Sequence, residues 1–98
     1  MITKNKTKTI PYDSAEFLET DEDMAAYLEA CLEENDPALI AHGLGVIARA
    51  KGMTQLSRET GITREGLYRA LSKDGNPEFA TVLKVFNALG LRLHASTN

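Results

Sequence analysis

Apolar residues recur at helical spacing in the first half of the chain. Between residues 21 and 35 they occupy the i, i+3, i+4, i+7 and i+8 positions of one helix face, namely Met24, Tyr27, Leu28, Cys31 and Leu32. Asp21 is a residue type that caps helices, and the two acids after it suit the positive end of the helix dipole. The pattern predicts an acidic, amphipathic helix that begins at Asp21.

A second helix is predicted to begin at Pro37 and to end near Gly52. The aspartate before it suits the cap, proline is favoured at a first helical position, and glycine is a common stop. Its inner face consists of Ile40, Leu44, Ile47 and Ala48. Gly43 and Gly45 each weaken a helix by about 1 kcal/mol relative to alanine. They therefore either permit a close backbone approach or are simply tolerated.

Two short helices with a glycine between them follow. Residues 53–60 form the first and residues 63–72 the second, with Gly61 in the turn and Thr63 as the cap of the second helix. Short helices joined by a turn of three or four residues that contains glycine are typical of a helix-turn-helix unit. In such a unit Leu56 is the apolar anchor, Ser57 is the small residue where the helices cross, and Ile62 packs into the core. Leu67, Ala70 and Leu71 form the inner face of the second helix.

The end of the chain predicts one more helix and leaves room for a short strand. Residues 74–77 form a turn sequence, and Gly90 ends the helix that follows. One face of that helix carries Phe79, Val82, Leu83 and Phe86, with Leu89 further along. Residues 91–95 alternate apolar and polar side chains, as a strand does. A lone strand needs a partner, which a second copy of the chain could supply.

The outer face of the second short helix carries groups that recognise nucleic acids. Arg64, near its start, can make a bidentate contact with guanine, and the N-terminal residues of a recognition helix read base edges. Glu65 could accept from cytosine or hold Arg69, and Tyr68 could contact a thymine methyl group or a phosphate. The candidate DNA-binding residues are Thr54, Gln55, Thr63, Arg64, Glu65, Tyr68, Arg69 and Lys73. Thr54, Gln55 and Lys73 suit phosphates. An ordinary solvated surface could carry the same side chains.

These elements predict an all-α protein, a Cro/phage-repressor-like helix-turn-helix bundle of five to six helices. We expect a flexible tail over residues 1–12 and an acidic helical extension over residues 13–36, in which Ser14–Leu18 forms one helical turn. The helix-turn-helix DNA-binding domain is expected over residues 37–98.

The charges are divided unevenly along the chain, whose net formal charge is −3. Residues 1–36 hold three lysines and ten acids, a charge of −7. Residues 37–98 hold eight lysines and arginines and four acids, a charge of +4. This division favours two partners of opposite charge, although acids on a plain solvated helix would give the same count.

The composition argues against several other classes of protein. A chain of 98 residues can bury one modest core, which oligomerisation would help to complete. The absence of a secretory leader and of any apolar run of about 18 residues favours the cytoplasm and no membrane partner. Cys31, the only cysteine, is expected to be a buried structural thiol. His42 and His94 lie far apart, and no cluster has the spacing of a metal or catalytic site. We predict no enzyme activity, no cofactor and no metal.

The run from Met53 to Leu93 resembles the probable addiction module antidote family, part of the wider Cro/repressor-like helix-turn-helix class. The segments that carry the resemblance are residues 53–61, 75–84, 21–28 and 10–13. The likeness therefore covers about residues 10–95. One departure is Ser57, where the wider class usually has alanine, but serine is small enough for the helix crossing to survive.

The resemblance implies an antitoxin of a type II toxin–antitoxin pair. Family members are encoded beside a small basic toxin similar to the RelE/HigB ribosome-dependent ribonucleases, block that toxin and repress their own operon. The implied partners are double-stranded operator DNA and such a toxin, with residues 63–72 as the DNA-reading helix. An RNA-binding toxin is expected to be basic, so the acidic helix could complement it. The candidate toxin-binding residues are Asp21, Glu22, Asp23, Glu29, Glu33 and Glu34.

Two alternatives remain open. The chain could be an antitoxin that binds protein only, with the helix-turn-helix as a scaffold, or a phage-type repressor without a toxin. Specific affinity for operator DNA would argue against the first, and a small basic reading frame beside this one would argue against the second. For DNA binding we expect a homodimer on palindromic half-sites about one helical turn apart.

Overall fold

The computed structural model describes residues 18–97, which form five helices and no strand. In chain order the helices are α1 (Asp21–Glu33), α2 (Pro37–Lys51), α3 (Met53–Thr60), α4 (Arg64–Ala70) and α5 (Phe79–Ala88). The prediction of an all-α fold is confirmed, at the lower end of its range of helices. The tail predicted over residues 1–12 and nearly all of the turn predicted at Ser14–Leu18 lie outside the described residues.

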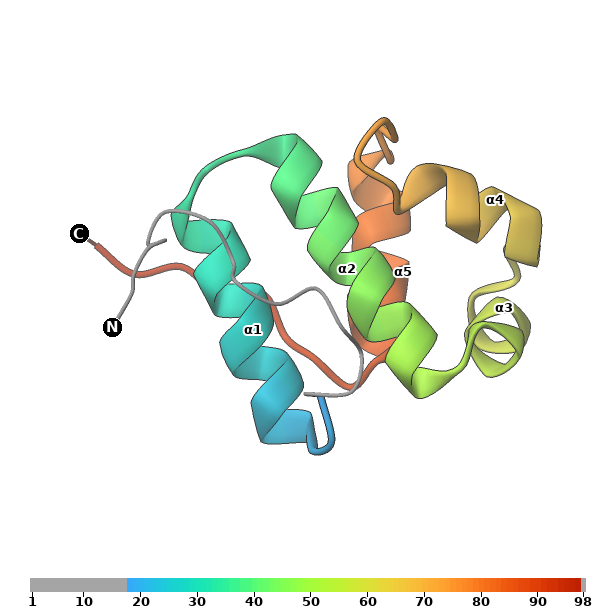
Figure 1. The fold of residues 1–98 in the computed structure, drawn as a ribbon, viewed down its shortest axis with the longest axis horizontal. Coiled ribbons are helices and arrows are strands. Elements are labelled where there is room, and N and C mark those ends of the chain that lie inside the picture. Colours follow the sequence, from blue (N-terminus) through green and yellow to red (C-terminus); the bar gives the residue numbers. More distant parts are fainter. Residues whose placement is uncertain (1–17, 98) are drawn as a thin grey trace, which may run out of the picture.

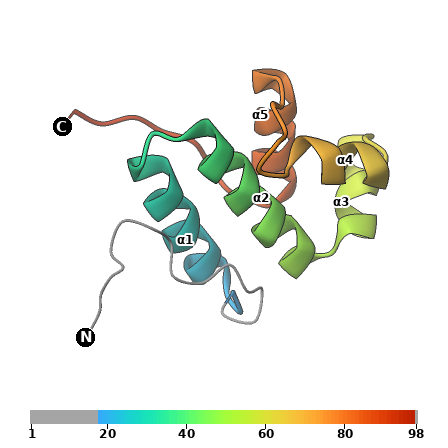
Figure 2. The ribbon, with the colours of Figure 1, turned by 45° about the horizontal axis from the view of Figure 1, so that its top comes forward.

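α2 is the central helix. Figure 1 shows α1 along one side of it, α5 behind it, and α3 and α4 on the side away from α1. In the turned view of Figure 2, α1 and the pair α3 and α4 are still on opposite sides of α2, and α5 stands above it. Leu44, Val46 and Ile47 of α2 are fully buried. They share one apolar core with buried residues from all four other helices. α2 therefore joins the acidic helix to the pair α3 and α4.

The two glycines of α2 are needed for close packing. A Cβ atom on Gly43 would lie 2.6 Å from the sulfur atom of Cys31 in α1. A Cβ atom on Gly45 would overlap the backbone carbonyl oxygen of Leu71, just after α4. Of the two interpretations of these glycines, the close approach is confirmed.

α1 begins at Asp21, as predicted, but Thr20, and not Asp21, is its cap. The Thr20 hydroxyl accepts a hydrogen bond from the Asp23 backbone N–H at 3.0 Å. The Asp23 carboxylate in turn accepts from the Thr20 backbone N–H at 3.1 Å. The prediction of Asp21 as the cap was wrong because this reciprocal bonding needs an acceptor side chain three residues after the cap. Met24 stands at that distance from Asp21.

The other predicted helix boundaries near the centre of the chain are confirmed. Asp36 caps α2 by accepting from the Ala38 N–H at 3.0 Å, and Pro37 is the first helical residue. Gly52 follows α2 with a φ of 116°. Such a positive φ is easy for glycine and rare for other residues.

α5 buries a different face from the predicted one. Val85 and Phe86 are buried, whereas Phe79 is 65% exposed and Leu83 is 39% exposed. The inner position predicted for Phe79 and Leu83 was wrong. Two overlapping stripes of apolar residues fit the helical period. The first consists of residues 79, 82, 83 and 86, and the second of residues 82, 85, 86 and 89. The fold buries the second.

The residues after α5 form no strand within the described chain, although the alternation over residues 91–95 predicts one. Gly90 takes a φ of 75°, and the Leu91 N–H donates to the Phe86 carbonyl at 2.9 Å. These are the marks of a Schellman motif, which ends a helix and redirects the chain. The redirected segment runs back past α1 (Figures 1 and 2). No described helix is both long and apolar enough to cross a membrane.

Candidate functional site

α3 and α4 form a compact pair joined by three residues, 61–63. Gly61 takes a left-handed backbone conformation with a φ of 76°. The Ser57 hydroxyl donates to the Ile62 carbonyl, and the Thr60 hydroxyl accepts from the Ile62 N–H at 3.2 Å. Ile62 is partly buried against the core. The turn is thus held from both sides, and the serine at position 57 bonds where an alanine could not.

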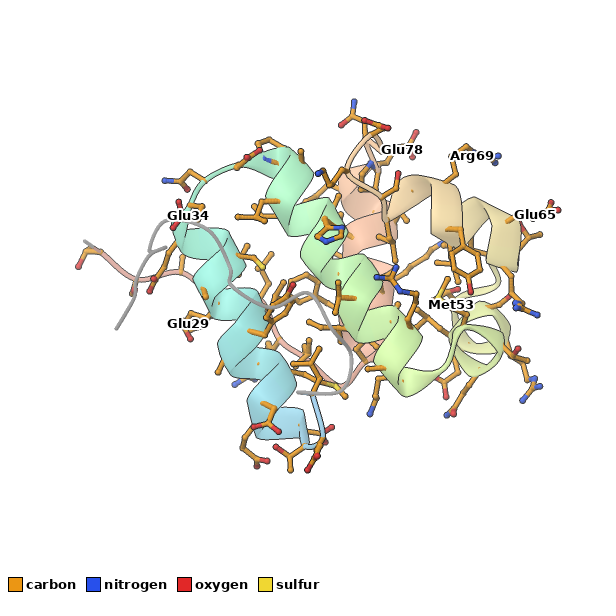
Figure 3. All side chains as sticks on the ribbon, in the orientation of Figure 1. Glu29, Glu34, Met53, Glu65, Arg69 and Glu78 are labelled. Atoms are coloured by element: carbon orange, nitrogen blue, oxygen red, sulfur yellow. The ribbon has the colours of Figure 1, made fainter. Side chains whose placement is uncertain are left out.

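α4 has one buried face and one exposed face. Leu67 is fully buried, and Leu71, directly after the helix, is 2% exposed. The exposed side chains of this helix are Arg64, Glu65, Tyr68 and Arg69. Figure 3 shows Glu65 and Arg69 pointing away from the body of the protein. The four candidate DNA-reading residues of α4 therefore share one accessible surface.

α4 ends at Ala70, two residues before the predicted end. Leu71 has a φ of −102° and a ψ of 41°, outside the helical range. A Cβ atom on Gly75 would overlap the carbonyl oxygens of Arg69 and Ala70. The turn after α4 therefore folds tightly against the helix end. Lys73 lies in this turn and is exposed.

The first turn of α3 has no side-chain cap, since its N-cap position is Gly52. The free N–H groups of an uncapped helix start are suited to phosphate oxygens. Thr54 and Gln55 are exposed there, and the Gln55 amide donates to the Glu59 carboxylate at 3.0 Å. Thr63, in contrast, caps α4 by accepting from the Gly66 N–H at 3.0 Å. The Thr63 oxygen therefore already has a structural role.

The surface of this helix pair is only slightly basic. Residues 53–74 contain four basic side chains, Arg58, Arg64, Arg69 and Lys73, and three acidic ones, Glu59, Glu65 and Asp74, a net charge of +1. All seven are exposed. Arg58 is absent from the sequence-predicted site although it shares this surface. Its helical spacing alone did not set it apart from any solvated residue.

The six predicted toxin-binding acids are all exposed at α1, but two of them also bond within the chain. The Asp23 carboxylate belongs to the capping pair with Thr20. Asp21 Oδ1 lies 3.4 Å from Lys51 Nζ of α2 in an exposed ion pair. Among the described residues, the capping pair and the ion pair leave out the other four acids, Glu22, Glu29, Glu33 and Glu34.

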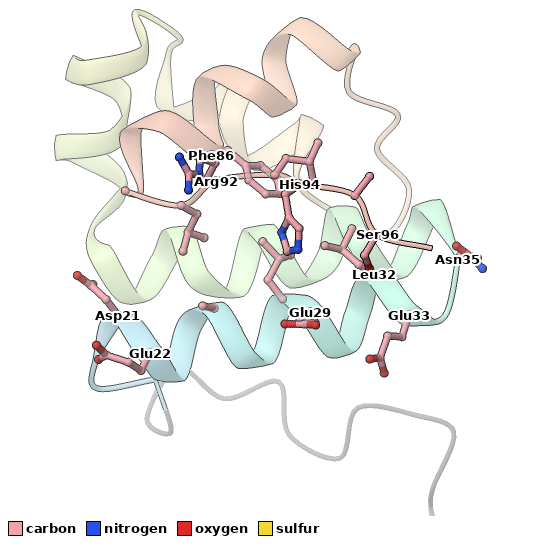
Figure 4. A pocket seen from close by; sticks show the side chains of 16 residues that line it. Asp21, Glu22, Glu29, Leu32, Glu33, Asn35, Phe86, Arg92, His94 and Ser96 are labelled. Atoms are coloured by element: carbon pink, nitrogen blue, oxygen red, sulfur yellow. The ribbon is translucent and has the colours of Figure 1, made fainter. Parts of the chain in front are cut away.

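Four of these acids line a groove of about 770 Å³ between α1 and the C-terminal segment. They are Asp21, Glu22, Glu29 and Glu33. Leu28, Leu32 and Phe86 contribute apolar surface. Figure 4 shows Arg92 and His94 on the C-terminal segment across from α1, with His94 directed toward Glu29. Asp23 and Glu34 do not line the groove.

The described residues offer no site for a metal ion, since they hold no group of three or more suitable ligands. Cys31 is fully buried, as predicted. Its burial, and secondarily the Glu34 carboxylate, raises the pKa of the thiol to about 11. A thiol with so high a pKa is protonated at neutral pH and is a poor nucleophile.

The chain is similar to a described protein family and to a protein of Haemophilus influenzae. A family described as "Probable addiction module antidote protein" matches residues 8–97. A protein of Haemophilus influenzae, described only as uncharacterized, is 52% identical over 81 residues, which cover 83% of this chain and 84% of that protein. No solved structure matches the chain.

Proposed function

Since the chain belongs to the probable addiction module antidote family, we propose that it neutralises a small basic RelE/HigB-like toxin and represses its own operon. In this proposal α4 reads operator DNA. The observation that carries the DNA-binding half is the exposed outer face of α4, held on a short helix pair with a three-residue turn. Both proposed partners would place the protein in the cytoplasm.

The side chains of α4 suit a major groove. Arg64 is the first residue of the helix, where a recognition helix approaches base edges most closely. A bidentate contact from an arginine to guanine is worth about 1–3 kcal/mol of discrimination. Tyr68, 45% exposed, offers a ring for a thymine methyl group and a hydroxyl for a phosphate. Residues 37–98 would supply this DNA-binding unit, and residues 13–36 an acidic extension.

Phosphate contacts would fix the position of the helix on DNA. The uncapped start of α3 provides backbone N–H donors, and Arg58 and Lys73 provide charge. Arg58 and Lys73, the basic side chains assigned to phosphates, limit each copy to a few contacts that neutralise a phosphate charge. A steep dependence of affinity on salt therefore requires two copies, because the slope of log K against log salt is about −0.9 for each phosphate neutralised.

The two proposed partners would meet opposite ends of the molecule. α1 lies on one side of α2, and α3 and α4 lie at the other end (Figure 1). This separation supports binding of toxin and operator at the same time. Family members that repress together with their toxin would need such an arrangement.

A salt-dependent titration against the DNA upstream of the gene tests the DNA-binding half. We expect tight binding to this DNA over a scrambled sequence, and loss of that preference in Arg64→Ala/Arg69→Ala. Arg92→Ala is the control, because it removes an exposed arginine from the end of the molecule near α1. If the wild type binds both DNAs equally and weakly, the DNA-binding half of the proposal is wrong, and the protein is an antitoxin that binds protein only.

A further inference from the structure

We propose that the groove between α1 and residues 90–96 receives a basic amphipathic helix of the toxin. This inference rests on the proposed function, because it assigns the surface that the toxin occupies. The groove combines an apolar floor with a row of carboxylates along α1 (Figure 4). The apolar floor calls for an apolar stripe on the bound helix, and the carboxylates call for basic side chains beside that stripe.

The floor favours an apolar stripe on the partner. Leu28 and Phe86 are part of the core, whereas Leu32 is only partly buried and Leu93 is 38% exposed. Ala25 also lines the groove, with a small and exposed side chain. A partner helix that laid its apolar face here would remove this exposed apolar surface from water, as helix-in-groove complexes do.

The rim along α1 favours a basic flank on the same partner. Glu22, Glu29 and Glu33 are seven and four residues apart, which places them along one side of α1. α1 has 13 residues, so this side is about 20 Å long at 1.5 Å per residue. Lysines or arginines on a helix of several turns could follow it. Complementary charges of this kind speed encounter and select the partner.

The rim opposite α1 would determine which flank of the partner helix faces α1. Arg92 and His94 stand on the C-terminal segment, and among the described residues no ion pair joins them to the acids of α1. Within residues 18–97, the ion pair at this end joins Lys51 to Asp21 and leaves Glu22, Glu29 and Glu33 open to a partner. An occupant with one basic flank therefore fits with that flank on the α1 side only.

Two matched pairs of variants test the groove against the rest of the acidic helix. Glu29→Lys reverses a charge in the groove, and Glu34→Lys makes the same change at a sequence-predicted toxin-binding acid that lies outside the groove and that this proposal excludes from the interface. Ala25→Phe fills the groove, and Ala26→Phe adds the same ring at a neighbouring exposed position that does not line it. The binding partner is the purified product of the reading frame next to this gene, measured by titration calorimetry. Circular dichroism checks that all four variants keep the helical fold.

We expect Glu29→Lys and Ala25→Phe to weaken binding about tenfold or more, and both controls to stay within about threefold of the wild type. Wild-type binding that all four variants retain would overturn the groove and leave the antitoxin function standing. Equal losses in groove variants and controls would also overturn it, in favour of a diffuse acidic surface. Absence of binding by the wild type would instead overturn toxin capture itself, and the groove with it.

Discussion

At the scale of single residues, one absent methyl group allows α2 and α4 to meet. A Cβ atom at Gly45 would overlap the Leu71 carbonyl oxygen, a backbone atom that cannot rotate away. We expect Gly45→Ala to lower the free energy of unfolding by about 1–3 kcal/mol, although alanine favours a helix over glycine by about 1 kcal/mol. Urea denaturation measures the difference. A gain in stability would mean that the two backbones can separate without loss.

Gly43 offers a controlled version of the same test, because its obstacle can be removed. A Cβ atom there would meet the Cys31 sulfur atom at 2.6 Å. We expect Gly43→Ala to destabilise the wild type clearly and to cost much less in a Cys31→Ala background. The double-mutant cycle measures this coupling. Additive effects of the two substitutions would show that the sulfur atom is not the obstacle.

The thiol of Cys31 should be inert until the protein unfolds. Its pKa is raised by burial, and further by Glu34, from 9.0 to about 11, and only the thiolate reacts readily. We expect slow modification by a disulfide reagent at pH 8 in the native protein and rapid modification in urea. Fast native-state reaction at the same pH would contradict the buried position.

The same shift links stability to alkaline pH. The folded protein holds the Cys31 proton more tightly than the unfolded chain, so the stabilising contribution is complete below pH 9 and is lost as the pH rises toward 11. We expect the wild type to lose more stability over this range than Cys31→Ala does. Parallel pH profiles for the two proteins would refute the link.

At the scale of helices, the capping pair of α1 can be separated from its surface charges. Thr20→Ala removes the acceptor for the Asp23 N–H and should cost about 0.5–2 kcal/mol. Asp21→Asn disrupts an exposed ion pair, whose contribution is about 1 kcal/mol or less. Thermal or urea unfolding of both variants should therefore rank Thr20→Ala as the less stable. The reverse order would restore Asp21 as the main determinant of this helix end.

Helix positions could be predicted from the sequence where the signals were local. Pro37, Gly52 and Gly61 mark boundaries through backbone preferences that act within a few residues. The buried face of α5 could not be predicted in this way, because Val82 and Phe86 belong to both candidate stripes and only packing against the other helices decides between them. The exposed face of α4 was predictable, since Leu67 and Leu71 define its inner side.

At the scale of the whole molecule, the groove beside α1 could not be predicted from the chain. Its walls come from residues 21–35 and 86–96, which are distant in sequence. The Schellman turn at Gly90 is a local feature, but its consequence is not, because the direction of the segment after it depends on where α5 has packed. The sequence pattern instead predicted a strand, which the described chain lacks.

An exposed apolar stripe on α5 is a candidate interface for the homodimer that the sequence predicts. Phe79 and Leu83 lie one helical turn apart with Ala80 beside them, so none of the three carries a charge that would oppose the same stripe on a second copy. A dimer joined there would carry two α4 helices, the number that a palindromic site requires. The second copy would also double the basic side chains that face the phosphates.

Phe79→Gln/Leu83→Gln tests this arrangement without disturbing the core, because both side chains are already largely or partly exposed. We expect light scattering to show a dimer for the wild type and a monomer for the variant. Operator affinity should fall by tenfold or more, because each half-site then binds one copy independently. Lys84→Gln, an exposed substitution on the same helix, should leave the dimer intact. If the variant stays dimeric, the dimer interface lies elsewhere on the protein. If the wild type is monomeric at micromolar concentration, two copies come together only on the DNA. Toxin binding at α1 should be unchanged in every case, which separates loss of assembly from loss of fold.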